Sequence, residues 1–265
     1  MMMKSLACLT LGLFLAACAQ VPLTHRQSLQ LLPQSQLMSM SLQEYSSVLK
    51  KSRLSQDPAK VEMVRRVGWN IARSAEAFLR DEGREQQIKE FQWEFNLIED
   101  DEVLNAWCMP GGKVAVYTGI LPVTRDEAGL AVVVGHEVAH ALANHGNERM
   151  SQGLLATVGS VALSVALAEK PSQTRQLFMA AFGVGASVGV LLPYSRMHES
   201  EADRIGLMLT ARAGYDPREA VPFWQRMNER GGAKAPEFLS THPAPASRIE
   251  DIKAHLPEAM RYYRR

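Results

Sequence analysis

The sequence has little net charge and no long apolar run, and each absence excludes a class of protein. The 29 Lys and Arg residues nearly balance the 28 Asp and Glu residues, so the formal charge is +1. Such a small charge creates no broad positive field for holding nucleic acid. Two apolar segments, residues 153–168 and 177–192, are each shorter than the roughly 20 residues of a membrane-spanning helix. We interpret them as a hairpin of buried helices or as a non-spanning segment that touches the membrane or covers a cleft.

Cysteine is also scarce, and the three cysteines indicate where the protein resides. Lys4, an apolar run over residues 6–15 and small residues at Ala16 and Ala17 together predict a secretory signal peptide. The Leu-Ala-Ala that precedes Cys18 resembles the bacterial lipobox, in which the cysteine is lipidated and becomes the first residue of the mature protein. Cys8 is then removed with the signal peptide, and Cys108 is the only free thiol that remains, so no internal disulfide forms. Acyl chains on Cys18 predict lasting membrane attachment, and Ala19 after it favours the outer membrane.

Hydrophobic periodicity predicts an α+β fold, mostly helical with a small three- to four-stranded sheet. We expect a signal peptide over 1–17, a tether over 18–56 and one folded domain over 57–265. Within that domain Asp57-Pro58 begins a helix, and strands are expected over 91–98, 103–109 and 113–120. Helices are expected over about 124–150 and 195–213, after Asp216-Pro217 and after Pro245.

The segment His136-Glu137-Val138-Ala139-His140 lies inside the predicted helix over 124–150. Residues four apart share one helical face, so both imidazoles can reach a single metal ion. Glu137 borders the open side of that ion and can take a proton from bound water. Zinc lowers the pKa of such a water to about 7, which makes hydroxide available near neutral pH. The pattern therefore predicts His136 and His140 as zinc ligands and Glu137 as the general base.

A catalytic zinc ion needs a third protein ligand, and the best source is the segment from Ser195 to Asp203. Glu199 and Asp203 are four residues apart and share a face, whereas Glu201 points roughly the other way. We expect Glu199 to bind zinc and Asp203 to hydrogen-bond a ligand histidine.

Together these motifs resemble the gluzincin-like zinc metallopeptidases typified by HtpX, BepA and LoiP, relatives of the CAAX prenyl endopeptidase. The likeness runs from about Asn105 to Arg248. It includes Asn105-Ala106-Trp107, Pro110-Gly111-Gly112, the strand ending Val116-Tyr117-Thr118-Gly119, both zinc motifs and Ser240-Thr241-His242-Pro243. The resemblance implies one Zn²⁺ per chain on His136, His140 and Glu199, with Glu137 as base and Asp203 behind the ligands.

Three further expectations concern the surroundings of the ion. The resemblance brings His242 to the site, where it either occupies the fourth metal position or stabilises the oxyanion of the tetrahedral intermediate. An extended substrate is expected to pair with the strand over 113–120, through Val114, Val116 and Tyr117. His145 follows His140 by five residues, so we expect it to turn away from the metal and to serve structure.

The sequence therefore predicts a zinc endopeptidase on the periplasmic side of a bacterial envelope, lipid-anchored to the outer membrane. The resemblance implies that it degrades misfolded or unassembled envelope proteins, with envelope assembly machinery among its partners. Two alternatives stay open: a chaperone-like or scaffolding lipoprotein whose zinc site is latent under His242, and a metal-binding protein without catalysis.

Overall fold

Helices dominate the computed structural model, which describes residues 18–168, 170, 172, 175–176, 178–180, 192–230, 237–242 and 247–264. The α-helices are α2 (Gln34–Lys51), α3 (Pro58–Asp81), α4 (Glu85–Ile88), α5 (Leu121–Thr124), α6 (Glu127–Leu142), α7 (His145–Ala166), α9 (Leu192–Arg212), α10 (Ala220–Glu229), α11 (Glu237–Thr241) and α12 (Ser247–Ala259). Short 3₁₀ helices η1 (Thr118–Ile120) and η3 (Pro217–Glu219) precede α5 and α10. The strands are β1 (Cys18–Gln20), β2 (Gln27–Leu29), β3 (Glu94–Ile98), β4 (Ala106–Met109) and β5 (Lys113–Tyr117). This arrangement confirms the predicted α+β class.

The larger sheet has three strands in the order β3-β5-β4. Strand β5 pairs in parallel with β3 and antiparallel with β4, so it lies between them. Its side chains at Val114 and Val116 are fully buried. Within the described residues, β4 and β3 therefore form the two edges of this sheet.

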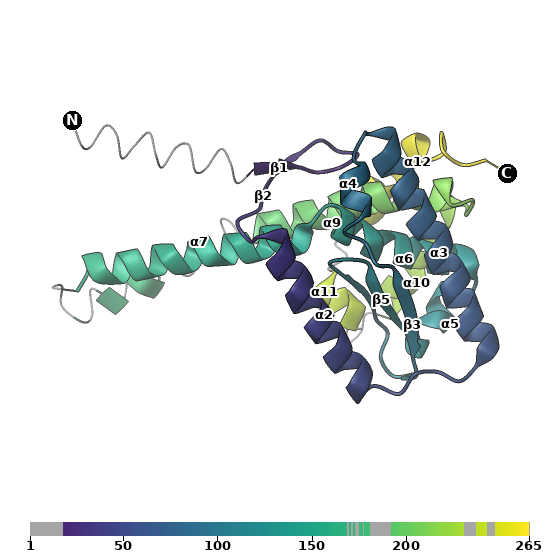
Figure 1. Ribbon diagram of the computed structural model, residues 1–265, viewed down its shortest axis with the longest axis horizontal. Helices are drawn as coiled ribbons and strands as arrows, with labels where there is room; N and C mark the ends of the chain where they lie inside the picture. Colours follow the sequence, from purple (N-terminus) through teal and green to yellow (C-terminus); the bar gives the residue numbers. More distant parts are fainter. Residues whose placement is uncertain are drawn as a thin grey trace.

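Helix α6 lies at the centre of the fold, packed against α9, α3 and β4 (Figure 1). Its start is fixed by Asp126, whose carboxylate accepts a hydrogen bond from the backbone N–H of Gly129. Almost every side chain from Leu130 to His140 is buried, because the helix is covered on all sides. A helix this deeply enclosed can hold polar groups only where they satisfy one another.

Two glycines allow α6 and α9 to approach closely. A Cβ atom at Gly206 of α9 would lie 2.9 Å from the backbone N of His136, and one at Gly135 of α6 would lie 3.0 Å from the carbonyl oxygen of Gly206. The first distance is shorter than real Cβ contacts, and the second is tight enough that the neighbouring backbone would have to shift. The absence of side chains at these positions therefore brings α9 directly against the helix that carries the histidine motif.

The helix predicted over 124–150 is in fact two helices, so that prediction was wrong at its C-terminal end. Helix α6 ends at Leu142, and Asn144 adopts a left-handed backbone with φ of 57° before α7 begins. Asparagine tolerates this conformation better than most residues. The prediction ran the helix through the polar stretch Asn144-His145-Gly146-Asn147, although asparagine and glycine are signals of a helix end.

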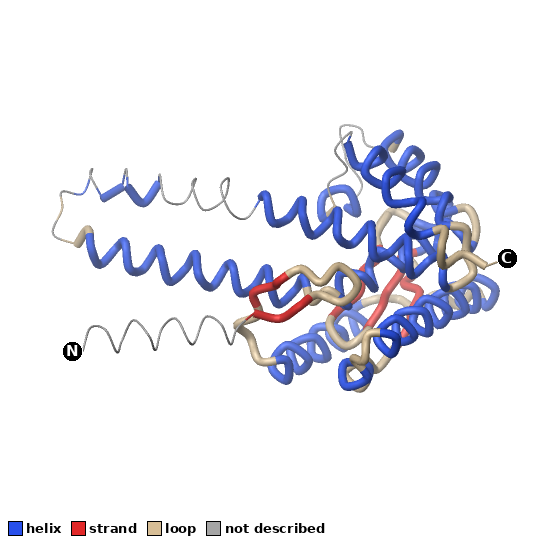
Figure 2. The backbone as a smooth tube through the Cα atoms, turned by 90° about the horizontal axis from the view of Figure 1, so that it is seen from above, coloured by secondary structure: helices blue, strands red, loops and turns tan. Residues whose placement is uncertain are grey.

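Helix α7 extends away from the rest of the molecule (Figures 1 and 2). Along it, Leu154, Val158, Val161 and Val165 recur on one face and are exposed. This helix is not the buried hairpin that one interpretation of residues 153–168 proposed. The partner segment 177–192 lies mostly outside the described residues. No helix among the described residues is both long and apolar enough to cross a bilayer.

The segment predicted as a tether over 18–56 lies against the domain. Strands β1 and β2 form an antiparallel pair, and α2 buries Leu37, Ser41 and Tyr45. The Tyr45 ring meets the Trp107 ring of β4 edge to face at 5.8 Å. Helix α2 therefore covers the sheet on the side away from α6.

Candidate metal centre

The two histidines of the motif lie on one face of α6, as their spacing predicts. His136 and His140 are 2% and 6% exposed, and their Nε2 atoms are 3.1 Å apart. Both Nε2 atoms therefore face the same point. Burial lowers the pKa of His140 well below its usual value, which favours the neutral imidazole that binds metal.

Helix α9 adds the acidic groups. Glu199 places one carboxylate oxygen 3.3 Å from His136 Nε2 and the other 3.4 Å from His140 Nε2. Burial alone would raise the pKa of Glu199, but hydrogen bonds from the surrounding imidazoles outweigh it and hold that pKa far below its usual range. The carboxylate is therefore ionised, as a metal ligand must be.

His242 completes the group from the opposite side. It follows α11 directly, and its Nδ1 lies 3.2 Å from His136 Nε2 and 3.0 Å from a Glu199 oxygen. The Phe238 ring lies against the imidazole of His242 with ring centres 4.7 Å apart. The structure therefore brings the sequence-predicted His242 to the same point as the other ligands.

These four side chains fit a metal ion. One ligand atom from each of His136, His140, Glu199 and His242 lies within 4.8 Å of the others, and all four residues are buried. No other group of this kind occurs among the described residues. Imidazole nitrogens with a carboxylate oxygen form the ligand set of catalytic zinc, so the cofactor of this chain is Zn²⁺.

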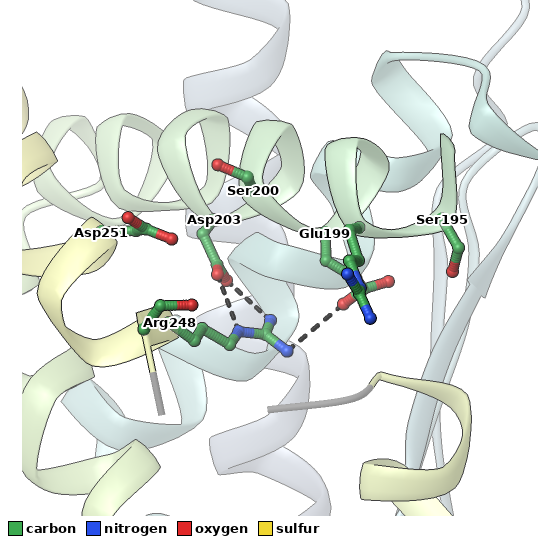
Figure 3. Close-up of a pocket in the computed structure, with 8 residues that line it drawn as sticks. Ser195, Glu199, Ser200, Asp203, Arg248 and Asp251 are labelled. Carbon is green, nitrogen blue, oxygen red and sulfur yellow. Dashed lines mark hydrogen bonds and ion pairs between the residues drawn. The ribbon is translucent and has the colours of Figure 1, made fainter. Parts of the chain in front are cut away.

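Asp203 and Arg248 support the ligand His136. Asp203 Oδ1 lies 2.9 Å from His136 Nδ1, and Arg248 donates to both oxygens of Asp203 at 2.7 and 2.8 Å (Figure 3). The Arg248 guanidinium also lies 3.6 Å from the centre of the Trp224 ring. Burial lowers the pKa of His136, but its hydrogen bonds to Asp203 and Glu199 raise it to about 9. The acidic partners of Arg248 are therefore Asp203 and, at 3.3 Å, Glu199.

A cavity of about 260 Å³ opens between α9 and α12 beside these groups (Figure 3). The residues that line it are Ser195, Arg196, Glu199, Ser200, Asp203, Ser247, Arg248 and Asp251. The acidic residues of α9 therefore border both the ligand cluster and this cavity.

Glu137 lies one residue beyond the ligand face of α6. It is 3% exposed, and burial raises its pKa. Its Oε1 has no hydrogen-bond partner among the described residues and lies 3.3 Å from His242 Nε2. A buried carboxylate oxygen with unused acceptor capacity beside the ligand cluster is suited to taking a proton from water.

The strand that we expected to pair with substrate does not lie at an edge of the sheet. Val114, Val116 and Tyr117 belong to β5, which is hydrogen-bonded on both sides and has no edge for a peptide to join. Prediction of these three residues as substrate-pairing positions was wrong, because strand order within a sheet is set by tertiary contacts. The neighbouring edge is β4, which packs on α6.

Sequence reasoning also missed a second buried polar cluster next to the ligands. The helix is interrupted at Asn144, and this turn brings His145 back onto His140, with their Nδ1 atoms 2.8 Å apart. Burial lowers the pKa of His145 to about 4, despite its contact with Glu201. Glu201 is in turn bound by Arg26 from the N-terminal segment. Asn144 was a signal for the break, whereas no pattern in the sequence pointed to Arg26.

Comparison with known proteins agrees with this geometry. Residues 70–256 match the model of Peptidase family M48. The chain is 40% identical to the mitochondrial metalloendopeptidase OMA1 of Schizosaccharomyces pombe over 65% of this chain and 49% of that protein. It is 31% identical to the mitochondrial metalloendopeptidase OMA1 of Homo sapiens over 91% of this chain and 46% of that protein. It is 32% identical to the beta-barrel assembly-enhancing protease of Yersinia pestis over 60% of this chain and 33% of that protein. The chain thus spans about half the length of the OMA1 relatives and belongs to Peptidase family M48.

Proposed function

We propose that the protein is a zinc-dependent endopeptidase. The observation that carries the proposal is the convergence of His136, His140 and Glu199 from two helices on one point. The buried carboxylate of Glu137, whose Oε1 accepts no hydrogen bond within the described residues, lies beside it. Three protein ligands next to a general base are the arrangement of catalytic zinc sites. Membership of Peptidase family M48 supports the same activity.

Each residue has a role that follows from its position. Zinc, when bound, polarises a water molecule and the peptide carbonyl. Glu137 takes the proton from that water and later delivers it to the departing amine. Asp203 holds His136 through Nδ1, which fixes the ring so that Nε2 faces the ligand cluster.

The peptide substrate is expected at the edge strand β4. A strand at a sheet edge offers unpaired backbone groups to an extended chain. Strand β4 lies on α6, the helix that carries Glu137, so a peptide paired with β4 would run past the base. This replaces the pairing with β5 that the sequence favoured.

His242 is the residue that decides between activity and latency. Its imidazole is 7% exposed and lies against both His136 and Glu199, where it can serve as a fourth ligand. A four-coordinate ion has no open position for water. This contact favours one alternative, a chaperone-like or scaffolding lipoprotein whose zinc site is latent. The other role of His242, a hydrogen bond to the oxyanion, would require the imidazole to lie outside the ligand cluster.

Casein cleavage tests the proposed activity. The wild-type protein should cleave casein with zinc and lose that activity on chelation. Glu137→Gln should retain zinc and lose cleavage, because the amide cannot accept a proton. Cleavage that persists in Glu137→Gln at the wild-type rate would remove the base from the mechanism. Bound zinc with no cleavage by the wild-type protein or by His242→Ala would favour the metal-binding protein without catalysis.

The cellular setting is also a proposal. The Leu-Ala-Ala-Cys18 sequence supports a signal peptide over 1–17, an acylated Cys18 and attachment to the outer membrane on the periplasmic side of the envelope. The beta-barrel assembly-enhancing proteases of Yersinia pestis and Escherichia coli, both similar to this chain, support misfolded or unassembled envelope proteins as substrates and envelope assembly machinery as partners. We keep residues 57–265 as the catalytic domain and the HtpX, BepA and LoiP type as the expected subgroup.

Two experiments test this setting. Cys18→Ser should release the protein from the membrane fraction, and retention of this variant would contradict the lipid anchor. Substrates trapped by Glu137→Gln in envelope extracts should be membrane or periplasmic proteins. A trapped set without envelope proteins would refute the proposed substrate class.

A further inference from the structure

The two zinc-ligand histidines of α6 are held in different ways. In each, Nε2 faces the other ligands and Nδ1 points away from them. The Nδ1 of His136 meets a carboxylate, Asp203, which an arginine binds through both oxygens. The Nδ1 of His140 meets a second histidine, His145. A ligand imidazole needs its second nitrogen fixed if the ring is to keep its orientation, so His145 occupies a position that matters to the metal.

The hydrogen-bond roles along this second route follow from the chemistry of imidazole. When His140 binds metal through Nε2, its proton is on Nδ1, which then donates to Nδ1 of His145. His145 accepts at Nδ1 and therefore carries its own proton on Nε2. That nitrogen lies 3.0 Å from Glu201 Oε2, to which it donates. Each atom in the series thus has one consistent role.

Glu201 is fixed by an arginine from the start of the described chain. Arg26 Nε donates to Glu201 at 2.8 Å, and both of its terminal nitrogens donate to Glu148 at 2.9 and 2.7 Å. The side chains of Glu201 and Glu148 are 6% and 2% exposed. Two buried carboxylates this close to one guanidinium would repel each other without it. Arg26 therefore holds the Glu201 and Glu148 carboxylates in place between its guanidinium nitrogens.

Other contacts hold Arg26 and its neighbours against α7. The backbone N–H of Leu31 donates to Ser151 at 2.8 Å, and the Leu32 carbonyl accepts from Asn147 at 2.9 Å. Val21 is buried in the core. The segment that contains Arg26 is therefore packed on the domain along much of its length.

We infer that Arg26, Glu201 and His145 are positioning residues for the zinc ligand His140, so that the N-terminal segment completes the metal centre. On the other side of the site Arg248 and Asp203 position His136 without an intervening histidine. Both supporting carboxylates come from α9, two residues apart, and each is bound by an arginine from outside that helix. This inference extends the proposed zinc centre, but its test does not depend on peptide cleavage.

The test compares zinc affinity in the full-length chain by competition with a chromophoric chelator. His145→Leu keeps a side chain of similar size but removes the nitrogen that accepts the hydrogen bond from His140. We expect this variant to bind zinc about 10- to 100-fold more weakly. His145→Asn places an amide oxygen near the position of Nδ1, so it should bind zinc more tightly than His145→Leu. A role in packing alone predicts the reverse order, because leucine fills the buried site better.

Arg26→Met tests the remote end of the series and covers the case in which His145→Leu does not fold. We expect zinc to bind about 10-fold more weakly. Arg226→Met is the matched control, because Arg226 is also mostly buried and bound to a carboxylate, Glu219, yet contacts none of the zinc ligands. It should lose stability without losing zinc affinity.

Three outcomes would overturn the inference: wild-type affinity in Arg26→Met, an equal loss in Arg226→Met, or weaker binding by His145→Asn than by His145→Leu. The cobalt-substituted protein gives a second readout, since its visible spectrum should change in Arg26→Met and not in Arg226→Met. If the wild-type protein cleaves no casein while this ranking of zinc affinity holds, the endopeptidase proposal fails and the positioning inference stands.

Discussion

Replacing Gly206 by alanine should separate the two helices that build the zinc centre. The added Cβ would lie 2.9 Å from the His136 backbone N, 3.0 Å from its Cα and 3.1 Å from the carbonyl carbon of Gly135. All three atoms are backbone in the middle of α6, so no flexible side chain can move aside. The helices must therefore move apart by several tenths of an ångström. Overpacking of this kind costs about 1–3 kcal/mol of unfolding free energy.

The displacement should also weaken metal binding. Glu199 lies seven residues, about two helical turns, before Gly206 on the same helix. Metal sites tolerate errors of only about 0.2 Å in ligand distance. We expect Gly206→Ala to lose about 1–3 kcal/mol of stability without metal and to bind zinc about 10-fold more weakly.

Urea denaturation of the metal-free protein and chelator competition measure the two effects separately. Gly153→Ala is the control, because a Cβ at Gly153 meets nothing within 4 Å. It lies inside α7, where alanine is favoured over glycine by about 0.5–1 kcal/mol. If Gly206→Ala matched the wild type in both measurements, the close approach of α6 and α9 would not position the ligands, and our account of the site would be wrong.

Three further predictions concern the polar groups around the metal. Asp203→Asn removes the negative charge beside His136 Nδ1, and chelator competition should show zinc affinity about 10- to 100-fold lower. His242→Ala should raise zinc-dependent casein cleavage if the imidazole blocks the open position and lower it if the imidazole stabilises the oxyanion; unchanged cleavage would contradict both roles. Burial alone would raise the pKa of Glu148, but hydrogen bonds from His198 and Arg26 outweigh it and lower that pKa from 4.5 to about 2. Between pH 4.5 and pH 2 the native state therefore binds fewer protons than the unfolded state. The stabilisation from ionised Glu148 is present above pH 4.5 and is lost toward pH 2, and it amounts to about 3 kcal/mol of unfolding free energy. Urea denaturation of metal-free Arg26→Met should show a shallower loss over the same window, and an unchanged slope would contradict the pairing.

The sequence was most informative where function depends on local spacing. His136 and His140 share a face because helical periodicity requires it, and the same rule paired Glu199 with Asp203. In the structure His136, His140 and Glu199 lie in one cluster, and Asp203 contacts His136. The prediction that Asp57-Pro58 begins a helix was also confirmed, with Asp57 accepting hydrogen bonds from the first turn of α3.

It was least informative where tertiary contacts decide. Strand β5 was expected to bind substrate, but whether a strand lies at an edge depends on which strands pair with it, and β5 has a neighbour on each side. The turn at Asn144 rests on a single left-handed residue in a polar stretch, and the predicted helix ran through it. That residue brings His145 onto His140. Arg26 could not have been found at all, because it is 175 residues from Glu201 in the sequence.

The separation of these segments along the chain has a thermodynamic consequence. His136, Glu199 and His242 come from three distant segments, so the unfolded chain holds no preformed site and zinc binds the native state. A ligand that binds only the native state stabilises it by an amount that grows with its affinity, about 1.4 kcal/mol for each tenfold. The stability that zinc adds should therefore fall in step with zinc affinity across Gly206→Ala, Asp203→Asn and Arg26→Met. A variant with weak zinc binding but an undiminished stability gain would show that zinc also binds outside this cluster.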